Sequence, residues 1–169
     1  MYVYNKNFLE NLYFNVRTMD VDFEKSGDEV VGIVLSLECD SQFAWIEYEV
    51  EFVTTENDQL IKVNNNSDDA YGYTKPVITI TANDAAEQYS IINTSENNRT
   101  TAIDNVVQDE IITIDSRLGK ISSSNQGRNF FEDFNNNFPR LLKDENELII
   151  SHPSSVKFNM ILPRKVGFF

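Results

Sequence analysis

The chain has 169 residues, of which 41% are hydrophobic and 12% aromatic, a composition typical of a folded protein with a self-sufficient core. Its formal net charge of −13, with only 14 basic residues, excludes a nucleic-acid-binding surface, because such surfaces neutralise phosphates with Lys and Arg. The single cysteine, Cys39, excludes an internal disulfide and a cysteine-based zinc cluster. No apolar stretch approaches the roughly 20 residues of a membrane span, so we expect no membrane insertion.

Two strands are predicted in the first third of the chain. Residues 30–38 alternate between apolar and other side chains, and the apolar ones that share a face are Val31, Ile33, Leu35 and Leu37. Residues 45–52 alternate more sharply. Their apolar face carries Ile46, Tyr48, Val50 and Phe52, and their opposite face carries Glu47, Glu49 and Glu51. The three carboxylates read as a solvated face rather than a cation site, because no loop completes a coordination shell around them.

Short strands separated by turns continue to the C-terminus. After a polar turn at 54–58, the predicted strands are 60–63, 77–81, 89–93, 110–115, 120–123, 147–151 and 156–162. Residues 64–73 and 94–101 are predicted as polar loops. One helical turn is expected at 130–134, before Pro139. Because helical periodicity is almost absent, the pattern indicates an all-β protein, an antiparallel two-sheet sandwich or a barrel.

The polar turn also marks the expected division of the chain, into residues 1–54 and 55–169. The sandwich is predicted over about 59–169, with 20–54 as an appended hairpin that is too small to close a sandwich by itself. The residues expected to supply much of the sandwich core are Val77, Ile78, Ile80, Ile112, Ile114, Leu148, Ile150 and Phe158.

No arrangement of residues points to catalysis. The only histidine, His152, stands before Pro153 in a predicted turn, and the chain has no nucleophile elbow of the Gly-x-Ser-x-Gly type. No glycine-rich phosphate loop is present. Asp68 and Asp69 follow an asparagine run without the spacing of a calcium loop. We therefore expect no enzyme activity, no catalytic residue, no cofactor and no metal.

Three segments, taken in order, resemble a known family. The segment NNNSDDAYGYTKPVITI covers 64–80, EIITID covers 110–115, and FPRLLKDENELIIS covers 138–151. In this order and at these spacings they resemble the C-terminal, galectin-like half of the distal tail protein family of long-tailed, non-contractile phages. Residues 16–45 look like the end of that family's N-terminal ring-forming domain, although Gln42 stands where proline is common.

The resemblance implies a structural role. Members of the family form a hexameric hub at the tail tip that connects the tail tube to the host-adsorption apparatus. The expected partners are other phage tail proteins: the tail tube, tape measure, tail-associated lysin and receptor-binding protein. The expected location is the virion tail tip, with the host cytoplasm during assembly. Residues 1–54 are then a remnant of the ring domain and 55–169 the galectin-like sandwich, so we expect a monomer or weak oligomer for this chain and a hexamer for the intact tail protein.

The sequence also leaves a second class of function open. A carbohydrate-binding β-sandwich for cell-surface glycans would use exposed aromatic side chains as stacking platforms, and the residues that could contact a glycan are Trp45, Tyr71 and Tyr73. A glycan hydrolase is disfavoured, because nothing in the sequence singles out one pair of carboxylates.

Overall fold

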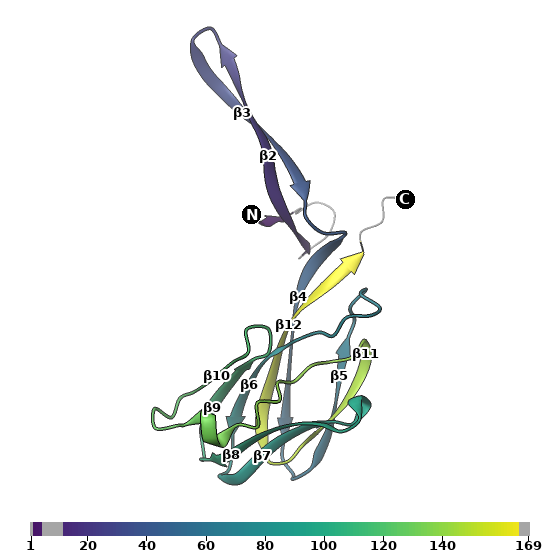
Figure 1. Cartoon of the computed structure of the whole chain (residues 1–169), viewed down its shortest axis with the longest axis vertical. Coiled ribbons are helices and arrows are strands. Elements are labelled where there is room, and N and C mark those ends of the chain that lie inside the picture. The colour runs from purple at the N-terminus through teal and green to yellow at the C-terminus, as the bar shows by residue number, and fades with distance from the viewer. Residues whose placement is uncertain (1, 5–11, 166–169) are drawn as a thin grey trace. The chain divides into compact units, whose positions relative to one another are not determined.

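The computed structural model describes residues 2–4 and 12–165 (Figure 1). The chain divides into two compact units, one made of residues 1–46 and 163–169 and the other of residues 47–162. The strands β4 (Phe43–Thr54) and β12 (Ser154–Lys165) contain the two points at which the chain passes from one unit to the other. The assignment of 1–54 to the remnant of a ring domain stays a prediction.

The larger unit is an antiparallel sandwich of two sheets. One sheet has the strand order β4-β12-β6-β9-β10, and the other has the order β5-β11-β7-β8. The bounds are β5 Gln59–Asn65, β6 Val77–Ala82, β7 Ala86–Asn93, β8 Arg99–Val106, β9 Ile111–Asp115, β10 Lys120–Ser123 and β11 Asp144–Ile150, with a 3-10 turn η1 at Thr94–Glu96 and one helical turn α1 at Phe130–Asp133. The predicted all-β sandwich with an appended hairpin is confirmed.

The core lies between the two sheets, where strand alternation places it. Of the eight core residues expected from the sequence, seven are at most 2% exposed, and Val77 is half-buried. On β4 the glutamates are exposed, as predicted; Glu49 Oε1 lies 2.6 Å from the ammonium of Lys157 on β12. The two-residue period of a strand explains both observations, because it sends successive side chains to opposite faces.

Two expectations from the sequence are wrong. Residues 94–101 are not a polar loop, because they contain η1 and the start of β8. Thr101 is 2% exposed, and its hydroxyl donates to the carbonyl of Asn137 at 2.7 Å, so a polar residue fills an inward position that the sequence pattern does not identify. The strand 45–52 does not belong wholly to the appended hairpin, because from residue 47 onwards β4 is part of the sandwich.

Two of the three motifs that carry the family resemblance, 64–80 and 138–151, meet in a buried amide network. The side-chain amide of Asn65 donates to the carbonyl of Leu142 at 2.9 Å, and its oxygen accepts from the hydroxyl of Thr74 at 3.0 Å. Asn146 accepts from the backbone N–H of Leu142 at 2.8 Å and donates back to the carbonyl of that residue at 2.9 Å. Both asparagines are fully buried. The recurring Asn and Thr positions therefore hold loops on the sheet edge rather than form a ligand site.

The smaller unit contains a long hairpin. β1 (Tyr2–Tyr4) pairs with β2 (Leu12–Ser26), β2 pairs with β3 (Glu29–Cys39), and the start of β2 pairs with the start of β4. The sequence pattern does not predict β2, because its apolar positions are interrupted by charged residues. The side chains of Tyr13 and Val16 are buried here.

Candidate assembly surface

The hairpin of β2 and β3 turns at Gly27 and Asp28, between the paired residues Ser26 and Glu29. Gly27 has a φ of +66°, the left-handed conformation that glycine adopts without the steric cost of a Cβ atom. A two-residue turn of this kind sets the register of both strands. Bulges between Thr18 and Asp20 and between Glu24 and Lys25 interrupt the ladder, and bulges increase the local twist of a ribbon.

One face of the hairpin is apolar and exposed. Val21 pairs with Leu35, and Phe23 pairs with Ile33. Because directly paired residues share a face, these four side chains form one continuous patch. Their exposed fractions are 43% for Val21, 49% for Leu35, 57% for Phe23 and 61% for Ile33. We call these four residues the apolar face.

The other face of the hairpin is mainly acidic. Asp20 pairs with Ser36, Asp22 with Val34, and Glu24 with Gly32. Near the base, the guanidinium of Arg17 donates to the carboxylate of Glu38, at 2.9 Å from Nε. The acidic side chains keep their face of the hairpin solvated. Burial against another surface is therefore favourable for the apolar face and not for the acidic one.

The alternation on β3 that the sequence shows is real, but its apolar side chains, such as Ile33 and Leu35, are exposed. A two-stranded ribbon is marginal by itself in water, and a contiguous exposed apolar patch in a protein commonly marks an interaction site. The exposed apolar face is therefore suited to docking against another protein surface.

The three aromatic residues proposed for glycan contact lie in two different units. Trp45 belongs to the smaller unit, whereas Tyr71 and Tyr73 belong to the larger one. Tyr71 is 98% exposed. The ring of Tyr73 lies 3.9 Å from the guanidinium carbon of Arg140, a cation–π contact. Glycan contact by these residues stays a prediction.

His152 lies in the turn before β12. Its Nδ1 is 2.8 Å from the hydroxyl of Ser151, and its ring lies against that of Tyr89, with 6.3 Å between the centroids. Burial raises the pKa of the Tyr89 hydroxyl, against the hydrogen bond with Ser154. Among the described residues, no three His, Cys, Asp or Glu side chains gather as a metal site would require. No helix in the same residues is long and apolar enough to cross a membrane.

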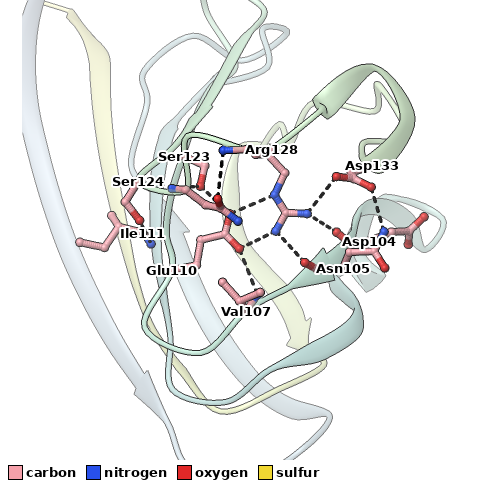
Figure 2. A network of polar contacts seen from close by, with 11 residues as sticks. Asp104, Asn105, Val107, Glu110, Ile111, Ser123, Ser124, Arg128 and Asp133 are labelled. Atoms are coloured by element: carbon pink, nitrogen blue, oxygen red, sulfur yellow. Dashed lines mark hydrogen bonds and ion pairs between the residues drawn. The ribbon is translucent and has the colours of Figure 1, made fainter.

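A buried ion pair holds the loop that contains α1 on the sandwich. Figure 2 shows the Arg128 guanidinium between the carboxylates of Glu110 and Asp133. Its five N–H donors all have acceptors: both Glu110 oxygens, at 3.0 and 2.5 Å, one Asp133 oxygen at 3.1 Å, and the carbonyls of Asp104 at 2.5 Å and Asn105 at 2.9 Å. The side chains of Arg128 and Glu110 are 3% and 0% exposed. The pair therefore joins β8, the turn before β9 and the α1 loop at one point.

The electrostatics of this pair favour its charged form. Burial by itself raises the pKa of the Glu110 carboxyl, but hydrogen bonds from Arg128, from the hydroxyl of Ser123 and from the N–H of Val107 outweigh burial, and the pKa is lowered. The pKa of Asp133 is also lowered, chiefly by the hydrogen bond from the side-chain amide of Asn105. Burial opposes this effect, and the hydrogen bond and charge of Arg128 add to it. Such a saturated pair is structural, because no polar atom of the guanidinium is left for a ligand.

Sequence reasoning misses the buried pair of Arg128 and Glu110, and it finds only the β3 half of the apolar face. Nothing near Arg128 distinguishes it from the other basic residues, since its acceptors lie up to 24 positions away in sequence. The apolar face is visible in the sequence as alternation on β3, and only the pairing with β2 shows that Val21 and Phe23 extend it.

Comparisons with known proteins agree with the fold. The family model described as the phage tail C-terminal domain matches residues 43–160. Among solved structures, the Dit protein (gp 19.1) of phage SPP1, described as a paradigm of the hub adsorption apparatus in phages that infect Gram-positive bacteria, superposes with a TM-score of 0.64 at 12% identity. The superposition covers 92% of this chain and 63% of that one, so the chain spans less than two thirds of the length of Dit. No curated protein matches the chain.

At this identity the likeness to Dit concerns the fold. The family match covers well over half of the chain, and it confirms the phage tail resemblance drawn from the three sequence segments. The chain belongs to the phage tail C-terminal domain family.

Proposed function

We propose that the chain is a structural, non-enzymatic subunit of a distal tail hub that links the tail tube to the host-adsorption apparatus of a phage or prophage. Its partners are then neighbouring hub subunits, the tail tube, the tape measure, the tail-associated lysin and the receptor-binding protein. Support comes from the family match and from the fold shared with Dit.

The observation that carries the proposal is the apolar face of the hairpin. A hub repeats one subunit around an axis, and head-to-tail contacts close into a ring when the rotation fits. Such a ring needs a surface on each subunit that a neighbour buries. The apolar face is such a surface, because it is free of charged side chains in a chain of net charge −13, so self-association through it brings the fewest like charges together.

The energies predict weak association for this chain. Burying the remaining exposed half of four large apolar side chains contributes about 3–6 kcal/mol per hairpin. Association costs about 4–15 kcal/mol in lost translational and rotational freedom. One hairpin contact therefore supports at most a weak oligomer, and a stable hexamer needs further contacts.

Two neighbouring residues give a matched test. Ile33 lies on the apolar face and is 61% exposed, whereas Val34 lies on the acidic face and is 46% exposed. We expect multi-angle light scattering of the wild type to show a molar mass that rises with protein concentration. Ile33→Asp should abolish the rise, and Val34→Asp should leave it unchanged, because only the first places a charge in the contact.

Equal association of the two variants would contradict the assembly role of the apolar face. Circular dichroism of both variants should match the wild type, since neither residue belongs to the sandwich core. In intact virions of the phage that encodes the chain, we expect crosslinking and mass spectrometry to place it beside tail-tube and adsorption proteins. Its absence from the tail would refute the structural role.

A further inference from the structure

A groove of about 280 Å³ opens on the larger sheet of the sandwich. It is lined by Glu47, Tyr48, Glu49, Arg117, Asn159, Met160 and Ile161. The lining residues come from the neighbouring strands β4 and β12 and from the turn between β9 and β10. The proposed assembly role does not use this groove.

Hydrogen-bonding groups in the groove are unengaged. Within the described part of the chain, the Glu47 carboxylate and the Asn159 amide form no hydrogen bond or ion pair, and Asn159 is half-buried. The guanidinium of Arg117 has one long contact, 3.7 Å from its Nε to the carboxylate of Asp115. Glu49, by contrast, is neutralised by Lys157 at 2.6 Å. The Asn159 amide is open to solvent, and it is not among the buried polar groups that lack a partner. A ligand could therefore bond it in place of water without breaking a contact within the protein.

The sheet beside the groove continues the same chemistry. The row next to Asn159 runs through Lys157, Thr79, Thr113 and Ser122 on four neighbouring strands. In the part of the chain that the structure describes, the three hydroxyls of this row make no side-chain hydrogen bond. The hydroxyls make this row polar, and its one charged member, Lys157, is paired with Glu49.

The groove offers paired donors and acceptors rather than a net charge. A vicinal diol presents one O–H donor and one acceptor oxygen side by side. Asn159 can satisfy both, Glu47 accepts, and Arg117 donates. A phosphate would face the carboxylate of Glu47, and a metal ion would find one free carboxylate only, because Lys157 holds Glu49. We propose that this groove binds a neutral saccharide unit, with Glu47 and Asn159 as its hydrogen-bonding residues.

This inference goes beyond the proposed assembly role and does not depend on it. It also uses residues other than the three aromatic ones considered from the sequence. In a tail protein, a saccharide groove would add direct contact with surface polysaccharide to the structural function.

The test is an NMR titration of the isotopically labelled full chain with lactose, maltotriose and chitotriose at millimolar concentrations. At least one sugar should shift the amide resonances of residues 47–49 and 159–161. Asn159→Ala should abolish these shifts, and Glu47→Gln should weaken the apparent Kd about tenfold, because a charge-assisted acceptor is lost. Glu51→Gln is the matched control, because Glu51 lies on the same strand and bonds Ser155 outside the groove lining, and it should leave the Kd unchanged.

Each other outcome overturns the proposal. No shift with any of the three sugars, or equal weakening by Glu47→Gln and Glu51→Gln, excludes a saccharide site here. Shifts produced by trilysine and not by sugars, and lost when salt is added, would assign the groove to a basic peptide of a partner protein instead. Light scattering of the same variants should match the wild type, which separates this test from that of the assembly role.

Discussion

The hairpin and the sandwich are built from the same kind of strand and end in opposite environments. In the sandwich, Ile78 and Ile80 alternate with threonines and are fully buried, because a second sheet covers their face. In the hairpin, Ile33 and Leu35 alternate with other side chains and stay about half exposed or more. Alternation therefore determines which side chains share a face, and the presence of a covering layer determines whether that face is a core or a contact surface.

The largest effect on stability is expected when a buried phenylalanine is compared with an exposed one. Phe158 is fully buried and packs edge-on against Phe52 at 6.0 Å, whereas Phe23 is 57% exposed. Phe158→Ala should lower the free energy of unfolding of the sandwich by about 3–5 kcal/mol, and Phe23→Ala should change it by less than about 0.5 kcal/mol. Urea denaturation followed by circular dichroism measures both. Similar losses would show that the hairpin face is packed in the folded chain.

The sandwich and the hairpin can also be compared through one ion pair in each, a buried pair with Arg128 and an exposed pair with Arg17. Arg128 is buried with Glu110, whereas the pair of Arg17 and Glu38 on the hairpin is 66% and 50% exposed. Arg128→Met leaves a buried carboxylate without its partner and should cost about 3–5 kcal/mol. Arg17→Met should cost at most about 1 kcal/mol, since an exposed pair gains little over solvation. Urea denaturation of the two single variants measures both losses. A Glu110→Gln/Arg128→Met double variant should recover part of the stability that Arg128→Met loses.

The buried pair also predicts a pH dependence. The pKa of Glu110 is lowered in the folded state from an ordinary value of 4.5, so its ionised form stabilises the fold. This stabilisation is fully present above pH 4.5, and it is lost as the pH falls from there through the folded-state pKa. The free energy difference between wild type and Glu110→Gln should therefore be constant near neutral pH and shrink on acidification. A difference that grows on acidification would contradict the lowered pKa.

The smallest effect on stability is expected at the two turn glycines, Gly27 and Gly119. Gly27 and Gly119 have φ values of +66° and +61°, and a Cβ atom added to either residue would meet no heavy atom within 4 Å. Alanine at either site should strain the turn by about 1 kcal/mol without a clash. Gly119→Ala should shift the unfolding midpoint of the sandwich, since its turn joins β9 and β10. Gly27→Ala should act on the hairpin alone, which amide hydrogen exchange of β2 and β3 would detect.

Much of the sandwich could be predicted because its signals are local. Each of Ile78, Ile80, Ile112 and Ile114 stands in a short β-branched alternation, and a turn residue ends each strand, so the strand and its inner face follow from a few neighbouring residues. The sequence pattern did not predict β8, because the inward residues of this strand include Thr101, whose burial depends on a hydrogen bond to a distant carbonyl. The amide motifs around Asn65 and Asn146 identified the family, but their mutual contact is a property of the folded sheet edge.

The amino-acid sequence alone was sufficient for the all-β class, most of the core and the phage tail resemblance, since strand period, turn residues and motif order are readable along the chain. The partners of Arg128, the unengaged groups beside Asn159 and the exposure of the hairpin face required the tertiary structure. Each of these depends on which residues meet, or fail to meet, across long stretches of chain, and a local pattern carries no such information.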